Sequence, residues 1–579
     1  MKTQSRFHSV PACWTVVLLF AVLATAPRLD AATFVTQQAY LKALNTGAGD
    51  GLGNSVAISG DTIAVGIPGD DSGAIGVNGD AFDNSRTNSG AVAILVRAQG
   101  VWQQQAWLKA SNPDMGDLFG AAVALDGDTL AVGAFWEDSA ARGVNGDQTD
   151  NSATNSGAVY VFQRTGTNWA QQAYLKLSNT EGGEEFGRAV AISGDTIVAG
   201  AALEWSAATG VNGDQADNSA PVAGAAYVFV REGTNWTQQA YLKASNTEAS
   251  DRFGDSVAID GDTIAVGAVF EDSGATGANG NQFDNSITNS GAVYVFVRTA
   301  TNWTQQAYLK ASNPGTSIRS GFTIGDEFGT SVSVSGGTLV VGARNEASAS
   351  AGINGDQSDN SLPLVGAAYV FARTGVTWTQ QAYVKPVNPR LCSEFGWSVA
   401  ALDEGRILVG ARSERSKATG VNGDAFNFGA LQSGAAYLFT RAAGTWSQAA
   451  YLKASNTETY DYFGVAVAGS GDTLLIGAPG EDSAAVGVNG NQADNTAPGA
   501  GAAYLFTSTL VPDLTLFRNS PGATVISWPS PSTGWYLQQN TVLNGGTWTT
   551  PPDTISDDGS TRSITINSSG GQRFFRLAQ

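Results

Sequence analysis

The sequence holds few of the residues on which most enzymes depend. Among its 579 residues there are only 1 His, 2 Cys and 2 Met. His8 and Cys13 fall within residues 1–32, which have the pattern of a signal peptide, so the mature chain would keep Cys392 and no His. Such a chain cannot form an internal disulfide bond, and it excludes Ser-His, Cys-His and His-metal chemistry.

Basic residues are also scarce. The sequence has 31 Lys and Arg against 51 Asp and Glu, for a formal net charge of −20. Nucleic acids attract basic surfaces, so this balance argues against a nucleic-acid partner. A strongly acidic surface keeps a protein soluble outside the cell and binds cations weakly. We therefore expect an extracellular protein or a polysaccharide as the partner.

Long apolar runs are missing after the N-terminal segment. Residues 1–32 begin with the basic residues Lys2 and Arg6, continue with the apolar run Trp14–Ala26 and end on a pair of alanines. This pattern predicts a cleaved signal peptide and a secreted or cell-surface location. The run is short for a membrane span, and an uncleaved N-terminal anchor is the alternative. We expect no transmembrane segment in the mature chain.

One sequence motif recurs seven times. It consists of an aromatic residue or Leu followed by Gly, a short apolar stretch, a Gly-Asp-Thr turn, and a second apolar stretch. The copies begin at Leu52, Phe119, Phe186, Phe253, Phe328, Phe395 and Phe463. Their period is about 67 residues, apart from one longer step between the fourth and fifth copies, and such a period indicates a repeat architecture. The 71 Gly residues favour many short strands joined by tight turns.

Each copy is predicted to contain four strands, which we name A to D. Strand A is exemplified by Ser55–Ser59, and Gly60 with Asp61 forms a two-residue turn into strand B, Thr62–Gly66. A long polar loop then leads to strand C, an unbroken apolar run such as Ala292–Val297, which is typical of a strand buried on both faces. Strand D, such as Trp303–Ala311, carries a Gln pair that suits an outer position.

Seven copies of four antiparallel strands predict an all-β fold, a seven-bladed β-propeller over residues 33–508. A copy of strand D precedes the first strand A, whereas the last strand C, Gly501–Phe506, has no strand D after it. Residues 33–44 are therefore expected to supply that strand and close the ring, which removes unpaired edges. Residues 511–579 leave the repeat, and their alternating stretches predict a small β-sandwich-like C-terminal module.

The FG, GDT and VGA elements resemble the FG-GAP repeat of integrin α-subunit propellers and of many bacterial exported proteins. The resemblance covers residues 33–508 and implies the propeller scaffold, but propellers host many activities and the fold does not name a ligand. Integrin-type propellers bind calcium in a long Asp-rich hairpin between strands A and B. Here that hairpin is only the Gly60-Asp61 turn, so this calcium loop is not carried over.

The loops between strands B and C, the B–C loops, carry a second motif, Asn-Gly-Asp-x-x-Asp-Asn-Ser. Hard oxygen ligands on a Gly-containing loop suit Ca²⁺, so we predict calcium as a cofactor here. The candidate ligands are Asp71, Asp80, Asp83, Asp138, Asp147, Asp150, Asp214, Asp217, Asp272, Asp284, Asp356, Asp359, Asp482 and Asp494. Asn, Asp and Ser also recur in loops because they bend and cap the backbone through local hydrogen bonds, and this second interpretation stays open.

The B–C loops and the loops from strand D to the next strand A, the D–A loops, are expected to share one face, where function gathers on a rigid scaffold. This loop face is acidic except in the fifth and sixth copies. The candidate ligand-binding residues there are Arg319, Arg344, Arg390, Arg412, Arg415 and Lys417. They would attract an anionic polysaccharide or an acidic protein surface; the alternative is that they only neutralise nearby carboxylates.

We assign no catalytic residue, because near-identical copies repeat their carboxylates whereas an enzyme needs one unique constellation. The Trp that begins strand D recurs in register, which favours packing over a sugar-binding platform. The sequence thus predicts an exported, non-catalytic adhesion or ligand-binding propeller, with calcium as a stabilising ion. The alternatives are a carbohydrate-active hydrolase or lyase that uses two carboxylates, and a purely structural surface repeat protein.

Overall fold

The computed structural model describes residues 33–402, 405–442, 444–510, 514–520, 523–530, 535–542, 547–558, 561–567 and 573–578. The predicted signal peptide, residues 1–32, lies outside this set. Every regular element in the described residues is a β-strand. None of these residues forms a helix that could cross a membrane. Backbone contacts divide the chain into two compact units. One is Val35–Thr509, and the other holds the described residues from Leu510 onward together with Thr33 and Phe34.

The described part of the first unit contains seven four-stranded antiparallel sheets, which we number in chain order, and one two-stranded hairpin. The strands are, in sheet 1, β2 (Val56–Ser59), β3 (Thr62–Ile67), β4 (Ala91–Ala98) and β5 (Val101–Leu108); in sheet 2, β6 (Ala122–Asp126), β7 (Thr129–Ala134), β8 (Ala158–Thr165) and β9 (Asn168–Leu175); in sheet 3, β10 (Val190–Ser193), β11 (Thr196–Ala201), β12 (Ala225–Glu232) and β13 (Asn235–Leu242); in sheet 4, β14 (Phe253–Asp260), β15 (Thr263–Ala268), β16 (Ala292–Thr299) and β17 (Asn302–Leu309); in sheet 5, β20 (Phe328–Ser335), β21 (Thr338–Ala343), β22 (Ala367–Thr374) and β23 (Thr377–Val384); in sheet 6, β24 (Phe395–Ala401), β25 (Arg406–Ala411), β26 (Ala435–Ala442) and β27 (Thr445–Leu452); in sheet 7, β28 (Val467–Ser470), β29 (Thr473–Ala478), β30 (Ala502–Leu510) and β1 (Thr33–Leu41).

Local chemistry explains the strands of each sheet. Ser59 of β2 pairs with Thr62 of β3, and Gly60 between them has a φ of 55°, as the two-residue turn requires. β3 is buried along its whole length, and the first half of each third strand, such as β16, is buried on both faces. The fourth strands alternate between exposed and buried residues at their start, which agrees with an outer position. The predicted strands A to D are thus confirmed to within a residue or two.

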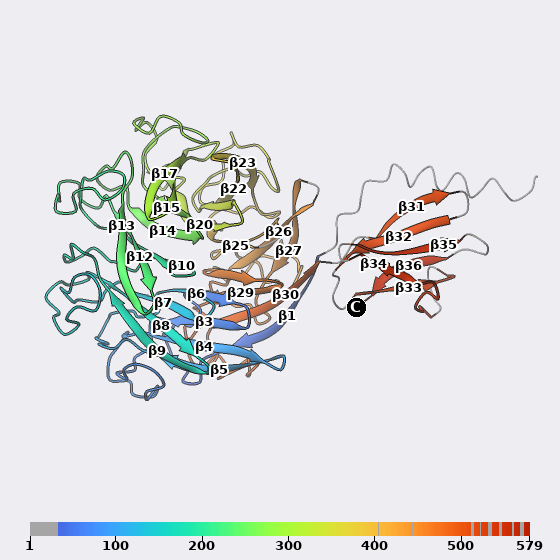
Figure 1. Cartoon of the computed structure of the whole chain (residues 1–579), viewed down its shortest axis with the longest axis horizontal. Helices are drawn as coiled ribbons and strands as arrows, with labels where there is room; N and C mark the ends of the chain where they lie inside the picture. Colours follow the sequence, from blue (N-terminus) through green and yellow to red (C-terminus); the bar gives the residue numbers. More distant parts are fainter. Residues whose placement is uncertain are drawn as a thin grey trace, which may run out of the picture. The chain divides into compact units, whose positions relative to one another are not determined.

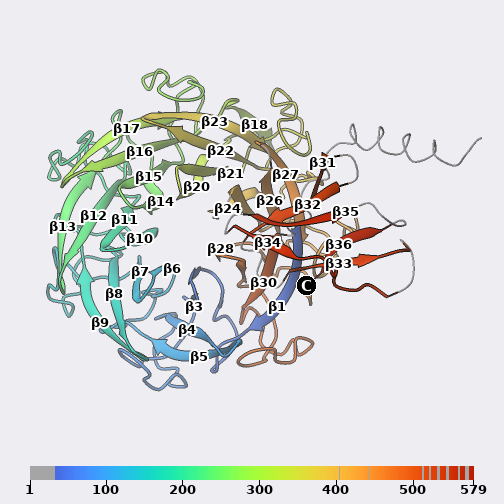
Figure 2. The ribbon, with the colours of Figure 1, turned by 45° about the vertical axis from the view of Figure 1, so that its right-hand side comes forward.

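The sheets follow one another around a common centre. The first strand of each sheet contacts the first strands of the sheets on either side, and β28 of sheet 7 contacts β2 of sheet 1. Figures 1 and 2 show the sheets in chain order by colour, with β6, β10, β14 and β20 toward the inside and β9, β13, β17 and β23 at the rim. The FG glycines permit this packing: a Cβ on Gly120 would lie 2.3 Å from the carbonyl oxygen of Ala91 in the neighbouring sheet.

Sheet 7 combines the two ends of the repeat. Its strand order is β1-β30-β29-β28, so the N-terminal strand lies beside the last strand of the unit. The hydroxyl of Tyr40, at the end of β1, donates a 2.8 Å hydrogen bond to Glu481 Oε1 in the loop after β29. The amide of Gly60 in sheet 1 donates to Ser470 Oγ in sheet 7 at 3.1 Å. Sheet 7 therefore contacts sheet 1 through both its core strand and its turn.

Recurring Trp and Arg side chains connect neighbouring sheets. Trp169 Nε1 donates to Gln105 Oε1 of the preceding sheet at 2.9 Å. The same bond recurs for Trp236, Trp303 and Trp378. Arg164 binds Asp128 in its own sheet and Thr62 Oγ1 of sheet 1 at 2.8 Å. The interpretation of these Trp residues as packing residues is therefore confirmed.

Each sheet also buries one Lys–carboxylate ion pair, which the sequence analysis missed. The pairs have N–O distances of 2.6 to 3.0 Å, and both side chains are almost fully buried in every sheet. They are Lys42–Glu481, Lys109–Asp70, Lys176–Glu137, Lys243–Glu204, Lys310–Glu271, Lys385–Glu346 and Lys453–Glu414. Burial lowers the pKa of each Lys, and the facing carboxylate opposes that shift.

The second unit contains two small antiparallel sheets in its described residues. Their strands are β31 (Thr515–Ser520), β32 (Ala523–Pro529), β35 (Thr561–Asn567) and β34 (Ile555–Asp557) in one sheet, and β33 (Tyr536–Asn540) with β36 (Phe574–Ala578) in the other. Ile526, Trp528 and Ile564 of the first sheet form one buried cluster with Leu537 of the second. This arrangement agrees with a small β-sandwich-like module.

Candidate functional site on the loop face

The B–C and D–A loops interlock on one side of the sheets. The amide of Asn78 in the first B–C loop donates to the carbonyl of Trp107 at 2.7 Å, and the amide of Phe119 in the next D–A loop donates to Ser89. At its other end that D–A loop reaches the second B–C loop, where Asn112 Nδ2 donates to Gln148 O at 3.0 Å. Each D–A loop therefore lies between two B–C loops, and hydrogen bonds join neighbouring loops along the loop face.

The acidic residues predicted as calcium ligands mostly serve their own loops. Asp80 Oδ1 accepts a 3.0 Å bond from the amide of Phe82, and Asp71 Oδ1 accepts a 2.8 Å bond from the amide of Asn88. The first bond recurs at Asp147, Asp214 and Asp356, and the second at Asp138, Asp272 and Asp482. Asp150, Asp217 and Asp359 accept a bond from the amide two residues later in the same way, and Asp494 accepts one from the Thr496 hydroxyl. Asp83 and Asp284 accept bonds from the amides of Gly73 and Gly274 through their backbone carbonyls.

These loops do not present a ready cage of acidic ligands. No three His, Cys, Asp or Glu side chains in the described part of the chain come close enough to share a metal ion. The bonds to the amide and hydroxyl of Thr149 lower the pKa of Asp147, which matches a carboxylate that holds its own turn. A calcium ion would therefore need backbone and amide oxygens beside one or two carboxylates, which is within the range of oxygen ligands that Ca²⁺ accepts.

Two of the predicted ligand-binding cations converge on one aromatic ring. The guanidinium carbons of Arg344 and Arg412 lie 4.9 and 3.2 Å from the centre of the Trp397 ring. Each also has a carboxylate partner: Arg344 Nε donates to Glu327 at 2.5 Å and Arg412 Nε donates to Glu394 at 2.8 Å. For these two residues the charges are neutralised locally, as the alternative interpretation of the sequence states.

A second group of cations gathers in the loops of sheet 6. The guanidinium carbon of Arg390 lies 3.6 Å from the centre of the Phe428 ring. Arg415 and Lys417 stand on the facing segment of the same B–C loop, where Lys417 N donates to Asn427 O and Arg415 O accepts from Gly429 N. No carboxylate lies within 4.0 Å of the charged groups of these three cations in the described chain. The Nε of Arg415 is buried without a hydrogen-bond partner there.

Arg319 stands apart from both groups. It belongs to a two-stranded hairpin, β18 (Thr316–Arg319) and β19 (Phe322–Gly325), which occupies the longer loop between sheets 4 and 5. Its side chain is exposed, and it makes no ion pair within the described residues. The six predicted cations therefore form one neutralised pair, one unpaired group of three and one separate residue.

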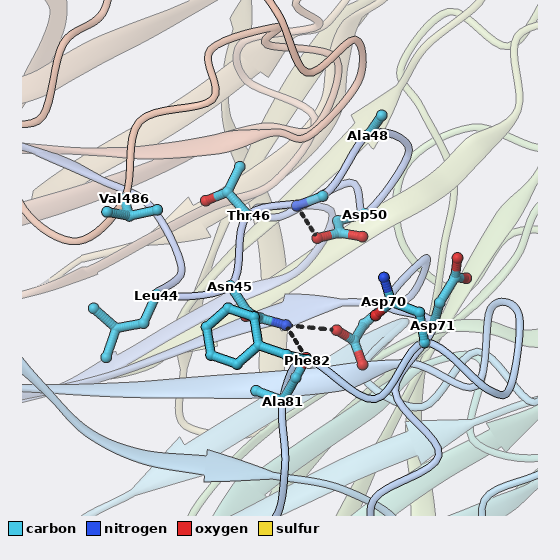
Figure 3. Close-up of a pocket in the computed structure, with 12 residues that line it drawn as sticks. Leu44, Asn45, Thr46, Ala48, Asp50, Asp70, Asp71, Ala81, Phe82 and Val486 are labelled. Carbon is cyan, nitrogen blue, oxygen red and sulfur yellow. Dashed lines mark hydrogen bonds between the residues drawn. The ribbon is translucent and has the colours of Figure 1, made fainter.

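A pocket of about 240 Å³ opens where the loops of sheets 7 and 1 meet (Figure 3). Asn45 lines it and donates from Nδ2 to Asp70 Oδ2 at 3.0 Å and to Ala81 O at 2.9 Å. Phe82 and Leu44 form an apolar side, and Asp50 and Asp71 line the pocket as well. The sequence analysis did not find this pocket.

Buried carboxyl groups recur in the D–A loops. Burial raises the pKa of Asp117 to about 7 and that of Glu184 to about 8, although a backbone amide three residues earlier donates to each carboxylate and lowers its pKa. Equivalent residues are Asp50, Asp251, Asp326 and Asp461. Perturbed carboxyl groups mark functional sites in many proteins, but here they repeat from sheet to sheet and so belong to the scaffold.

Repeated four-stranded antiparallel sheets around a common centre define a propeller-type repeat protein. A model of the FG-GAP repeat family matches residues 35–92, 102–162, 169–229, 236–296, 303–371 and 446–506. These ranges cover more than half of the chain, which belongs to the FG-GAP repeat family, as the recurring FG and GDT elements predict. The matched ranges omit residues 372–445, which contain the unpaired cations of sheet 6. A search of curated proteins found no match.

Proposed function

We propose that this protein is an exported, non-catalytic propeller that binds an anionic ligand at the loops of sheet 6. In this proposal the seven sheets are the blades of one closed ring, and β1 supplies the outer strand of the last blade. The ring is the scaffold, and ligand binding depends on Arg390, Arg415 and Lys417. The family supports a ligand-binding propeller, and the residues that break the repeat support the choice of site.

The observation that carries the proposal is a local reversal of charge. The loops of sheets 6 and 2 can be compared by aligning the buried Lys that precedes each D–A loop, Lys385 and Lys109. In this alignment Arg390 occupies the position of Asp114, and Ser393 occupies that of the buried Asp117. Counted from the buried Glu that follows each strand B, Arg415 replaces Asp138 and Lys417 replaces Ala140. Asn427 and Phe428 replace Asp150 and Asn151. Four carboxylates of the sheet 2 loops are thus absent here, and three cations stand in the same place.

The consequence for binding is electrostatic. In sheet 2 Asn151 Nδ2 donates to Asp114 Oδ2 at 2.6 Å, so the polar groups at this position satisfy each other. In sheet 6 the same position holds Arg390 against Phe428, and no hydrogen bond of the Arg390 guanidinium is found among the described residues. A cationic group within an acidic loop face attracts and orients an anion. Uronic or sulfated polysaccharides present such anions along a chain.

The proposal is tested by binding to heparin, alginate and neutral dextran over a salt series. Replacing Arg390, Arg415 and Lys417 together by Ser should reduce heparin or alginate binding by roughly tenfold or more and flatten its salt dependence. The control replaces Arg97, Arg142 and Arg319 by Ser, which removes the same charge from positions outside sheet 6. Equal binding by the two triple variants would place the site elsewhere. Absence of any binding by the wild type, or cleavage of the polysaccharide, would contradict a non-catalytic anion receptor.

A further inference from the structure

The pocket at sheet 1 exists because three side chains that fill this place in other copies are missing. In sheets 2, 3, 4, 5 and 7 a Ser hydroxyl of the D–A loop donates to a Gln of the B–C loop across this gap. In sheet 1 the same positions hold Leu44 and Ala81, so no bond forms and the Gln volume is absent. Gly47 stands where sheet 2 has Asp114, which removes a third side chain.

The lost side chains leave polar groups without partners. In sheet 2 the amide of Asn151 donates to Asp114, but for the equivalent Asn84 the position of Asp114 is held by Gly47, and the Asn84 side chain makes no hydrogen bond among the described residues. In sheets 2 to 7 a Tyr hydroxyl of the third strand donates to the Asn at the base of the loop. Sheet 1 has Ala93 in place of that Tyr, and Asn45 Oδ1 is buried without a donor.

An apolar wall stands beside these polar groups. Phe82 is 74 % exposed, and Leu44 and Val486 are more than half exposed, although all three line the pocket. Figure 3 shows the Phe82 ring and the Leu44 side chain on the same side, with Asp70 and Asp71 across from them. Large apolar side chains that are exposed around a hollow favour contact with a ligand that has an apolar face of its own.

The charges exclude the simplest ionic ligands. Three carboxylates, Asp50, Asp70 and Asp71, line the pocket, so an anion would be repelled. Asp70 is already paired with the buried Lys109 at 2.8 Å, and Asp50 Oδ2 accepts from the amide of Gly47, so these two carboxylates do not need a cation. The acidic groups also do not converge as a metal cage in the described chain.

From these contacts we infer that the pocket binds a single neutral sugar ring, with its hydroxyl groups on Asn84 and Asp71 and its C–H face on Phe82. A pyranose combines several hydroxyl donors with one apolar face, which matches an acceptor-rich pocket with one aromatic wall. The volume lies below the roughly 300 Å³ of drug-sized sites, so it suits one ring of a longer glycan. This site is separate from the cations of sheet 6 and does not depend on the proposed anion binding.

The test fills the pocket with the side chains that five other copies already carry. The double variant Leu44→Ser and Ala81→Gln restores the Ser–Gln bond, so it should fold normally and retain the thermal midpoint of the wild type. Saturation-transfer NMR is recorded with the methyl glycosides of glucose, galactose, mannose and N-acetylglucosamine. We expect at least one of them to bind the wild type and to lose fivefold or more of its affinity in the double variant and in Phe82→Ala.

The matched control is Phe283→Ala, because Phe283 occupies the same loop position in sheet 4, is 77 % exposed, and stands where Ser245 and Gln282 close the gap. Sugar binding should be unchanged in this variant. The inference is overturned if no sugar binds the wild type, if the double variant binds as well as the wild type, or if a lysine pentapeptide occupies the pocket instead. Heparin binding is measured in parallel, and since it depends on sheet 6, its loss or retention separates the two proposals.

Discussion

The guanidinium of Arg390 lies against the ring of Phe428, at the place where sheet 2 sets the carboxylate of Asp114 against the amide of Asn151. One cation–aromatic contact thus replaces one hydrogen bond between the same two loops. The exchange keeps the loops together, because a cation–π contact at an exposed site contributes about 0.5–1 kcal/mol, similar to a single hydrogen bond. It changes the charge of the surface without changing the fold.

This relationship predicts that the anion site can be removed by restoring the repeat. The double variant Arg390→Asp and Phe428→Asn recreates the pair seen in sheet 2. We expect it to fold with a thermal midpoint close to that of the wild type and to lose heparin binding, as measured by surface plasmon resonance. The reciprocal change in sheet 2, Asp114→Arg with Asn151→Phe, is the control for loop packing. Heparin binding that survives the sheet 6 exchange would contradict a role for Arg390.

The N-terminal strand should hold the ring together. Deleting residues 33–44 removes β1 and both Tyr40 and Lys42, which bind Glu481 in the interior of sheet 7. We expect a clear fall in the thermal midpoint, because β30 would lose its outer partner and Glu481 would stay buried without a cation. Deleting the hairpin 316–325, which lies outside the seven sheets, is the control. If the two deletions lower the midpoint equally, the closure model is wrong.

Removing one partner of a buried ion pair should lower the free energy of unfolding substantially. Lys176→Met leaves Glu137, which is 1 % exposed, without its partner, and should lower the free energy of unfolding by about 3–5 kcal/mol. Adding Glu137→Gln should recover part of that loss, since no unpaired charge then remains. The exposed pair Arg97–Asp61 is the comparison, and Arg97→Met should cost less than about 1 kcal/mol. Denaturant unfolding measures all three, and equal losses for the two Met variants would be the contrary result.

The buried loop carboxyls predict that stability falls as the pH rises through neutrality. Burial raises the pKa of Glu184 and Asp251 to about 8 and that of Asp117 to about 7, above the values of about 4 in an unfolded chain. Between those limits the folded protein binds more protons than the unfolded chain, so this contribution to stability is present at low pH and is lost as the pH approaches 8. Thermal midpoints should therefore be higher at pH 5 than at pH 8.

The matched variant for this effect is Asp251→Asn, which keeps a side-chain acceptor for the amide of Glu248 but removes the titrating group. Its difference in midpoint between pH 5 and pH 8 should be smaller than that of the wild type. A midpoint that rises from pH 5 to pH 8 in the wild type would contradict the prediction.

Calcium binding by the B–C loops stays a prediction, and natural variation between the copies gives its control. If the loops bind Ca²⁺, a chelator should lower the thermal midpoint and added Ca²⁺ should restore it, with dissociation constants on the order of 10⁻⁴ to 10⁻³ M. Asp80→Asn with Asp83→Asn should remove one site. The turn itself should survive, because Asn281 and Asn491 make the same bond in sheets 4 and 7. The prediction would be contradicted if calorimetry showed no Ca²⁺ binding to the intact protein.

The repeat, its strands and its turns could be predicted from the sequence because their causes are local. A Gly-Asp turn such as Gly60-Asp61 sets a hairpin by its own φ angles, and an apolar run such as Ala292–Val297 reports a buried strand wherever it lies. The N-terminal strand could be placed with β30 by counting copies. Each of these inferences uses residues that are neighbours in the sequence or that recur at one fixed period.

The partners of charged side chains were decided by the tertiary structure alone. Lys176 and Glu137 are 39 residues apart and meet only because the fold brings the end of strand D next to the start of the B–C loop of the same sheet. The charge pattern of the sequence placed Arg344 and Arg390 in one candidate site. In the structure Arg344 lies on Trp397 and pairs with Glu327, whereas Arg390 lies on Phe428 and has no carboxylate partner among the described residues. The physical reason is that an ion pair or a pocket depends on distances of a few ångströms between separate loops, and composition records only that the groups exist.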